Sequence, residues 1–186
     1  YDEFCLKFTE RARGFKVGDP RDHDTVIGPL IDANQCEVID RQVQDALRKG
    51  ARLLTGGKHD GPFYEPTVLA DVTPDMDVFD QESFGPITSI VRAEDAEDAL
   101  ALCNNSQFGL SSALLTDDLQ KAFSLSMRMN IGKVHVNDTT FVSSTVAPSG
   151  GFKLSGVGKE GGHYSIEEFT ELKWITMQYQ DTQMPC

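Results

Sequence analysis

The chain has 186 residues, 39% of them hydrophobic and 25% charged, so it is long enough to bury a core of its own. Its 29 acidic residues outnumber 17 basic ones and give a net charge of -12, which argues against nucleic acid or an anionic membrane surface as the main partner. The apolar runs are too short to span a bilayer, and no signal-peptide pattern is seen at the start.

The first half of the chain alternates helix and strand patterns. Apolar residues at helical spacing predict an amphipathic helix over residues 2–13. After a polar loop, Asp32 or Asn34 can cap a second helix that stops at Gly50. Short apolar runs between turn residues predict strands at residues 51–54, 67–72 and 87–91.

The second half continues this alternation. Asp95 is expected to cap a helix, and residues 111–116, 118–129 and 133–137 read as strand, helix and strand. Such alternation predicts an α/β fold with a mainly parallel sheet flanked by helices.

The C-terminal region begins with a glycine-crowded loop. Six glycines lie between Gly150 and Gly162, and Ser165 and Glu168 have the spacing of a capping box for a short helix. Residues 172–179 predict a last strand that is apolar on both faces. Pairing with another subunit would cover both faces of this strand.

Several common motifs can be set aside. Gly156, Gly158 and Gly161 spell GxGxxG, but no strand directly precedes them, so we reject a dinucleotide fingerprint here. The four histidines lack metal spacing, and we expect no metal site. The four cysteines include no CxxC pair and none has a context that would activate it, which fits a reducing, cytoplasmic compartment.

One loop, residues 80–86, stands out. Glu82 is followed by Phe84, Gly85 and Pro86, which combines a hydrogen-bond acceptor, an aromatic plate and a rigid turn. A carboxylate can accept from both hydroxyls of a ribose, and a phenyl ring can pack on a flat cofactor ring. The alternative is a solvated loop acid beside a core phenylalanine.

Three segments together resemble the C-terminal part of the NAD(P)-dependent aldehyde dehydrogenase superfamily. They are GDPRDHDTVIGPLI at residues 18–31, QESFGPI at residues 81–87, and the VHVN…GGFKLSGVGKEGG block with its ELKWIT tail. The similarity covers essentially the whole chain. The wording is most similar to the aromatic aldehyde (benzaldehyde, vanillin) branch, while KGARLLTGGK and KEGG resemble semialdehyde dehydrogenases.

The resemblance implies oxidation of an aldehyde to a carboxylic acid with NAD or NADP. In the family a cysteine thiolate attacks the carbonyl, hydride passes to the cofactor, and a glutamate activates the water that releases the acid. That cysteine and glutamate are expected upstream of this sequence, so the chain alone is expected to be inactive. Its opening on Tyr1, within a helix pattern, suggests a piece of something larger.

The resemblance also assigns roles to individual residues. Glu82 matches the glutamate that holds the nicotinamide ribose, Phe84 the aromatic beside the nicotinamide, and Gln35 a weaker contact on the adenosine side. Asn137 ends a strand at the active-site wall, and residues 138–149 form the lip of the aldehyde tunnel, with Phe141 and Ser149 as candidate tunnel residues.

The pattern departs from the family at one point. Where family members usually carry an aromatic residue in a PFGG motif, this chain has Ser149, which opens the tunnel or makes it more polar. An aromatic aldehyde dehydrogenase, a semialdehyde dehydrogenase and an acylating dehydrogenase therefore all remain alternatives for the parent enzyme.

The resemblance also predicts the organisation of the chain. Residues 1–170 would be a partial catalytic domain, and residues 171–186 an oligomerisation strand and tail that joins the protein into a dimer or tetramer. A rival hypothesis is a cysteine-free cofactor-binding or assembly module with no chemistry of its own. Partners are otherwise a small-molecule aldehyde, with neither nucleic acid nor membrane.

Overall fold

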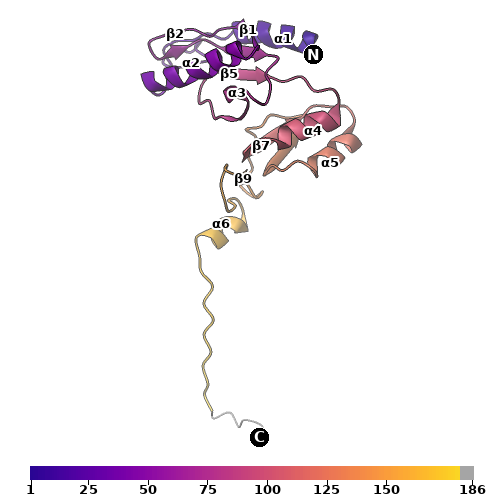
Figure 1. Cartoon of the computed structure of the whole chain (residues 1–186). Coiled ribbons are helices and arrows are strands. Elements are labelled where there is room, and N and C mark those ends of the chain that lie inside the picture. The colour runs from indigo at the N-terminus through magenta and orange to yellow at the C-terminus, as the bar shows by residue number, and fades with distance from the viewer. Residues whose placement is uncertain (181–186) are drawn as a thin grey trace. The chain divides into compact units, whose positions relative to one another are not determined.

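The computed structural model describes residues 1–180 and divides into two compact units that meet in the sequence between Gln107 and Phe108. The boundary expected between residues 170 and 171 stays a prediction. The first unit contains helices α1 (Asp2–Arg13), α2 (Ala33–Arg48), α3 (Asp77–Asp80) and α4 (Ala96–Asn104), with strands β1 (Arg52–Thr55), β2 (His59–Asp60), β3 (Phe63–Tyr64), β4 (Thr67–Ala70) and β5 (Ile87–Ile90) (Figure 1).

Strand β4 is the centre of the first unit. It pairs antiparallel with β1 and parallel with β5, so the sheet has the order β1-β4-β5. In the parallel pair Thr67 lies opposite Ile87 and Ala70 opposite Ile90. All four residues of β4 are buried, as expected for a strand covered on both faces.

Two helices supply that cover. Leu69 of β4 packs in a cluster with Ile39 of α2. Val68, one residue earlier, packs in a second cluster with Cys5 and Ala12 of α1. Because successive strand side chains point to opposite faces, α1 and α2 cover opposite faces of the sheet.

Aspartates begin three of the helices. Asp32, Asp95 and Asp118 accept hydrogen bonds from backbone amides of the first turn of α2, α4 and α5 (Leu119–Ser126), respectively. This confirms the predicted cap at Asp95 and decides between the two candidates for α2. The predicted end of α2 is also right to within two residues, since Gly50 follows with a left-handed φ of 103°.

The second unit is built on a parallel strand pair. Strand β7 lies beside β8 with Ser111 opposite Lys133 and Leu114 opposite Val136, and α5 makes the connection. A short antiparallel pair joins β6 to β9. Its elements are β6 (Phe108–Gly109), β7 (Ser111–Leu114), α5 (Leu119–Ser126), β8 (Lys133–Val136), β9 (Phe152–Lys153) and α6 (His163–Glu168).

The α/β class is confirmed, with some local differences. The pairs β4–β5 and β7–β8 are parallel as predicted, whereas β1–β4, β2–β3 and β6–β9 are antiparallel. Helix α3 and strands β2, β3, β6 and β9 were not predicted, because they are too short to show a periodicity.

The predicted capping box at Ser165 is wrong. Helix α6 begins at His163, so Ser165 lies inside the helix, and its hydroxyl accepts a hydrogen bond from the Gly161 amide at 2.8 Å. The serine therefore holds the preceding turn instead of the first turn of the helix.

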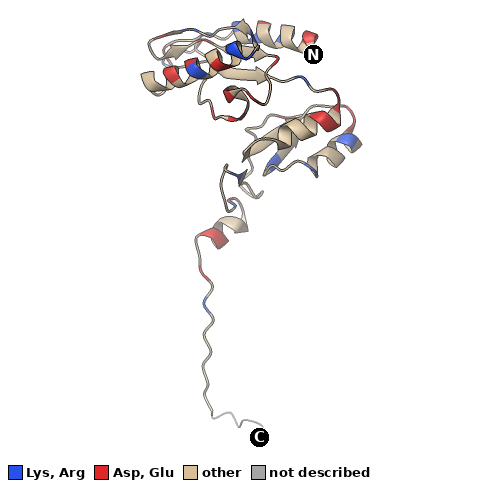
Figure 2. Cartoon of the chain, viewed as in Figure 1, with Lys and Arg blue, Asp and Glu red and all other residues tan. Residues whose placement is uncertain are grey.

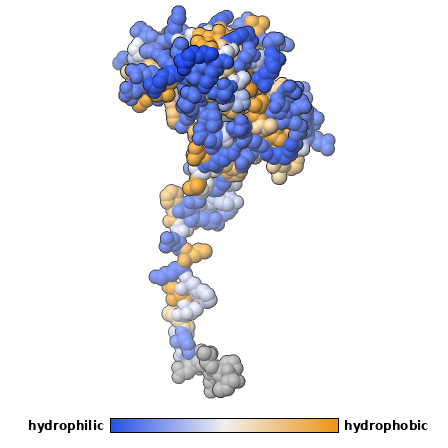
Figure 3. Space-filling model, viewed as in Figure 1, coloured by the Kyte–Doolittle hydropathy of each residue, from blue (hydrophilic) through white to orange (hydrophobic). Residues whose placement is uncertain are grey.

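Residues 171–180 form no strand within the described part of the chain. Their apolar side chains are exposed, with Trp174 at 89% and Tyr179 at 87%, and Figure 3 shows hydrophobic residues along this segment. Residues 181–186 of the predicted tail lie outside the described residues.

Charge is spread over the molecule. In Figure 2 acidic residues are coloured on several helices. Some of them form exposed ion pairs, such as Glu3 with Lys7. Within residues 1–180, none of the helices has the length and hydrophobicity that a membrane span requires.

Candidate cofactor and substrate site

The loop at residues 81–86 connects α3 to β5, and its backbone is anchored at both ends. The Gln81 amide donates to the Asp77 carbonyl at 2.9 Å, and the Pro86 carbonyl accepts from the Thr67 amide of β4 at 2.8 Å. Between them, Gly85 lies against α2 so closely that an added Cβ would stand 2.1 Å from Ile39 Cδ1. Only glycine allows this approach, because Ile39 is fully buried.

Two predicted cofactor residues project from this anchored loop. Glu82 is exposed, and the Phe84 ring is 73% exposed although its backbone has an unusual φ of 28°. A strained, exposed aromatic on a fixed loop gains nothing from packing in this unit. The alternative of a core phenylalanine is therefore wrong.

Gln35 joins the same group. Its side-chain amide donates from α2 to the Ser83 carbonyl at 3.0 Å, between the two projecting residues. The structure thus brings the three predicted cofactor residues together, although Gln35 acts here on the loop. A direct contact of Gln35 with a cofactor stays a prediction.

Asn137 has a structural function in the second unit. It follows β8 with φ 56°, and its side-chain amide both donates to the Thr116 carbonyl and accepts from the Thr116 amide, each at 2.9 Å. Its backbone amide donates to the Leu114 carbonyl at 2.8 Å. The side chain therefore extends the β7–β8 pairing by one step, which uses both of its polar atoms.

The other two predicted tunnel residues lie in different surroundings. Phe141 is 82% exposed. Ser149 is half-buried and exchanges two backbone hydrogen bonds with Glu160, at 2.7 and 2.8 Å. Ser149 also lines a cavity of about 250 Å³, which Phe141 does not line; the other lining residues are Gly132, Lys133, Val134, His135, Val142, Ser143, Ser144, Ala147 and Pro148.

This cavity has a polar wall. His135 of β8 lines it, and the Nε2 atom of His135 is buried without a hydrogen-bond partner among the described residues. Three serine residues line the same space. The cavity is thus bounded by β8, which Asn137 follows, and by the predicted tunnel lip.

The glycine motif has a structural role. Gly158 has φ 79°, and an added Cβ would lie 2.6 Å from a carboxylate oxygen of Glu168. That carboxylate accepts from the Lys159 amide at 3.1 Å. The Gly158 position is therefore packed against the carboxylate of Glu168 from the same chain.

Two of the thiols lie in the core of the first unit. Cys5 and Cys36 are buried, and burial raises the pKa of the Cys36 thiol, with a further contribution from the nearby Asp40 carboxylate. Within residues 1–180, no cluster of three or more histidine, cysteine or acidic side chains is arranged to bind a metal.

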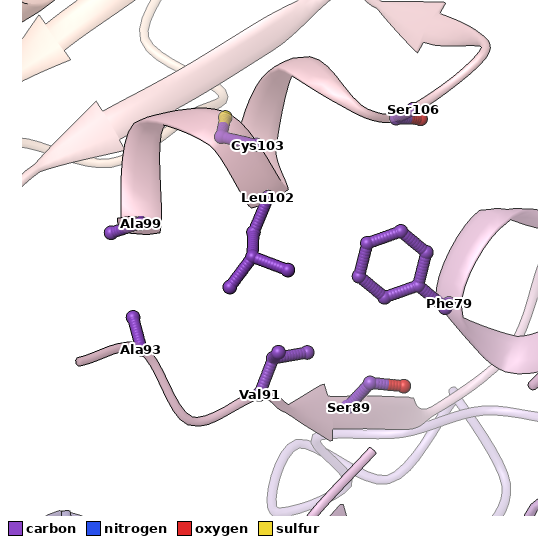
Figure 4. Close-up of a pocket in the computed structure, with 8 residues that line it drawn as sticks. All are labelled: Phe79, Ser89, Val91, Ala93, Ala99, Leu102, Cys103 and Ser106. Atoms are coloured by element: carbon purple, nitrogen blue, oxygen red, sulfur yellow. The ribbon is translucent and has the colours of Figure 1, made fainter. Parts of the chain in front are cut away.

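One hollow of the first unit was not predicted. It measures about 340 Å³, and in Figure 4 the side chains of Phe79, Val91 and Leu102 point toward one another, whereas the thiol of Cys103 points away. Its walls come from α3, β5, the segment after β5 and α4, which follow one another within residues 79–106. The hollow was missed because it depends on how these elements pack, which no motif within any one of them indicates.

Comparison with known proteins identifies the family. A family model described as the aldehyde dehydrogenase family matches residues 1–175. The chain belongs to the aldehyde dehydrogenase family. It is 38% identical over 185 residues to benzaldehyde dehydrogenase YfmT of Bacillus subtilis (strain 168), and 41% identical over 177 residues to vanillin dehydrogenase of Pseudomonas sp. (strain HR199 / DSM 7063).

Solved aldehyde dehydrogenase structures have the same fold. The salicylaldehyde dehydrogenase of Pseudomonas putida G7, complexed with salicylaldehyde, matches 99% of this chain with a TM-score of 0.93 and 38% identity. A Mycobacterium tuberculosis aldehyde dehydrogenase complexed with NAD+ matches 97% with a TM-score of 0.88 and 34% identity. A Methanocaldococcus jannaschii enzyme complexed with NADP matches 90% with a TM-score of 0.85 and 35% identity.

These relatives are much longer than the chain. The match to the Bacillus relative includes 100% of this chain but only 38% of the relative, and the match to vanillin dehydrogenase includes 95% of this chain and 37% of that enzyme. Of the three solved chains, the matched part is 38% for the Pseudomonas putida enzyme, 38% for the Mycobacterium tuberculosis enzyme and 36% for the Methanocaldococcus jannaschii enzyme. The described residues therefore correspond to little more than a third of a typical aldehyde dehydrogenase.

Proposed function

We propose that this chain is the portion of an NAD(P)-dependent aldehyde dehydrogenase that holds the nicotinamide end of the cofactor and part of the aldehyde tunnel. The anchored loop at residues 81–86 carries this proposal. It fixes the backbone by hydrogen bonds to neighbouring elements and leaves a carboxylate and an aromatic ring free to meet a ligand. Family membership over residues 1–175 supports the same function.

The residues of the loop fit the cofactor. The Glu82 carboxylate can accept hydrogen bonds from both hydroxyls of a ribose, and the Phe84 ring offers an open face for a flat heterocycle. The bound NAD(P)+ would supply the hydride acceptor for oxidation of the aldehyde. Glu82 and Phe84 would orient it, which contributes to the rate by fixing the distance and angle of approach.

The nucleophile of the reaction would come from the part of an aldehyde dehydrogenase that the relatives contain and this sequence does not cover. Cys36 is unsuitable for this role, because it is buried and its pKa is raised. We therefore assign no catalytic residue within residues 1–180, and we place Asn137, Phe141 and Ser149 near the substrate entrance.

For the substrate we propose an aromatic aldehyde, in line with the benzaldehyde, vanillin and salicylaldehyde dehydrogenases among the relatives. A semialdehyde is the second candidate, because serines line the cavity beside Ser149, and a succinate-semialdehyde dehydrogenase of Escherichia coli (strain K12) is 38% identical. Steady-state rates with benzaldehyde and succinate semialdehyde would separate the two.

We also propose that the protein assembles through residues 171–180. The exposed apolar side chains of this segment, Trp174 and Ile175 among them, would be covered by a second copy. Family membership favours a cytoplasmic enzyme, as does the spacing of the cysteines, which fits a reducing compartment.

The test of the cofactor assignment is the substitution Glu82→Gln in the full-length protein. Glu82 is exposed, so the variant should unfold at the wild-type temperature. Loss of charge-assisted hydrogen bonds to the ribose should raise the Kd for NAD(P)+ about ten-fold. Glu10→Gln, an exposed acid on α1, is the matched control and should bind the cofactor like the wild type.

Two outcomes would count against this function. Unchanged cofactor affinity in Glu82→Gln would remove the ribose contact. Cofactor binding without oxidation of any aldehyde would favour the alternative of a binding or assembly module.

A further inference from the structure

Gln42 is an unusual residue in the core of the first unit. It lies on α2 next to Val43, a member of the apolar cluster, and is only 2% exposed. Its amide nitrogen donates to the Glu82 carbonyl at 3.3 Å, while its amide oxygen is buried with no partner among the described residues. A buried amide with one unsatisfied atom is less stable than an apolar side chain of the same shape.

Gln42 is the middle one of three polar contacts that α2 makes with the segment leading to Glu82. The Asp45 carboxylate accepts from the Asp77 amide at 2.9 Å, at the start of α3. Gln35 donates to the Ser83 carbonyl at 3.0 Å. We call Gln35, Gln42 and Asp45 the α2 polar row.

The polar row fixes the backbone of residues 77–83 at its start and at its end. Gln35 and Gln42 lie seven residues apart, which is close to two helical turns, so both amides leave the same side of α2. They bind adjacent carbonyls, those of Ser83 and Glu82. Two bonds to neighbouring peptide units fix the direction of the chain as well as its position.

The fixed direction matters for the side chains that follow. With its carbonyl held by Gln42, Glu82 has its carboxylate exposed. Phe84, two residues on, keeps φ 28° and an open ring. A free loop would relax this strained conformation, so an external restraint is needed to keep it.

We propose that Gln42 is a positioning residue for cofactor binding, which acts through the Glu82 carbonyl and is retained for this purpose at the expense of core stability. The inference rests on the proposed function of Glu82 and Phe84. It adds a buried residue, remote from the ligand itself, to the set that determines cofactor affinity.

The substitution Gln42→Met tests it in the full-length protein. Methionine keeps the length of the side chain and removes the amide, so the variant should fold and its Tm should hold or rise. The Kd for NAD(P)+ should nevertheless increase about five-fold or more, as expected for loss of a hydrogen bond that orients the site. The KM for the aldehyde should stay unchanged, and amide hydrogen exchange in residues 81–86 should become faster.

Val43→Ala is the matched control. Val43 is the next residue of α2, is equally buried and has its side chain in the apolar cluster. This variant should lower Tm and leave both the cofactor Kd and the exchange of residues 81–86 close to wild type.

The outcomes separate the inference from the function on which it rests. If Gln42→Met binds the cofactor like the wild type while Glu82→Gln binds it weakly, or if Val43→Ala weakens binding as much as Gln42→Met does, the positioning role is wrong and the proposed function stands. If neither Glu82→Gln nor Phe84→Ala changes the affinity, the cofactor assignment fails, and the role of Gln42 fails with it.

Discussion

Asn137 and Phe84 both have a left-handed backbone, and the two residues are held in it by different means. Asn137 bonds through its own side chain to both polar groups of Thr116. Phe84 makes no such bond, and its loop is held through the carbonyls of its neighbours. The first residue therefore stabilises its own conformation, while the second depends on α2.

We predict that Asn137→Ala destabilises the second unit. The substitution removes two hydrogen bonds, each worth about 1 kcal/mol, and leaves a residue with a Cβ in a conformation that favours asparagine or glycine. Urea denaturation should show a loss of about 2–3 kcal/mol in the free energy of unfolding. Asn137→Gly should lose less free energy of unfolding, because it removes the same hydrogen bonds but glycine adopts a positive φ without strain.

Kinetics of the same variants test the substrate assignment of Asn137. An aldehyde KM that follows only the loss of stability would support a purely structural residue. A change in the aldehyde KM in Asn137→Gly under conditions where the protein is fully folded would support the predicted contact with the tunnel.

At this scale the sequence predicts local chemistry and misses distant contacts. Glu82, Phe84, Gly85 and Pro86 lie within five residues, so their combination of acceptor, ring and turn is readable without a structure. The contact of Gln42 with Glu82 joins residues 40 positions apart. Nothing in the local pattern of α2 distinguishes Gln42 from the solvent-facing polar residues around it.

Among the elements, α2 organises the first unit. Its apolar face covers the sheet through Ile39 and Val43, and its polar row holds α3 and the loop at residues 81–86. Asp45 is the most ionic of these contacts, because its carboxylate also pairs with the Lys49 ammonium at 2.8 Å. The hydrogen bond from the Asp77 amide and the pairing with Lys49 hold the pKa of Asp45 below its ordinary value of 3.8.

This shift predicts a dependence of stability on acid pH. The pKa of Asp45 is lower in the folded state than in the unfolded state, so ionised Asp45 stabilises the folded state. This contribution to the free energy of unfolding is complete above about pH 4 and is lost as pH falls through the folded pKa. Asp45→Asn should lower the free energy of unfolding at pH 7 and flatten its decline below pH 4. Urea midpoints from pH 2 to 7 measure both effects.

The control for Asp45 is Glu37→Gln, which removes an exposed acid from the same helix. It should leave the acid limb of the stability curve as in the wild type. An acid limb in Asp45→Asn that is as steep as that of the wild type would show that other carboxylates, such as Asp71 with its Arg52 partner, account for the decline.

Helices and strands were predictable where they are long enough for their hydrophobic periodicity to repeat. Helices α1 and α2, and the strands at residues 67–70, 87–90, 111–114 and 133–136, were expected within a few residues. The hairpin of β2 and β3 was missed because each strand has two residues and is held by tertiary contacts. Tyr64 of β3 is fully buried and donates to Asp40 of α2 at 2.7 Å, a contact that no local pattern announces.

For the whole molecule, residues 171–180 raise the question of what covers them. The segment is exposed within the described chain, and its single tryptophan, Trp174, reports directly on burial. The sequence predicted a strand here from its two apolar faces. Within residues 1–180 no strand pairs with this segment, and the predicted strand was expected to pair with another subunit.

We predict that the fluorescence of Trp174 depends on concentration. In dilute solution the emission maximum should be that of an exposed indole, and assembly through this segment should shift it to shorter wavelength as the ring leaves water. Ile175→Asp should abolish the shift, because a charge would have to be buried at the interface. Light scattering gives the mass of each species.

The substitution Lys173→Ala serves as the control, since Lys173 is an exposed charged residue of the same segment. It should assemble like the wild type. A blue-shifted maximum that does not change with dilution would mean that Trp174 is covered by its own chain, and the proposed interface would have to be abandoned.

The attachment of the loop at residues 81–86 also determines which of its positions can change without disturbing the core. Gln35 and Gln42 donate hydrogen bonds to peptide carbonyls, which every amino acid provides. These hydrogen bonds therefore do not depend on which side chains stand at positions 82 and 83. Substitutions there would alter the ligand-facing chemistry while the loop keeps its course. Variation in cofactor or substrate preference could thus accumulate at these positions without a compensating change in the core beneath them.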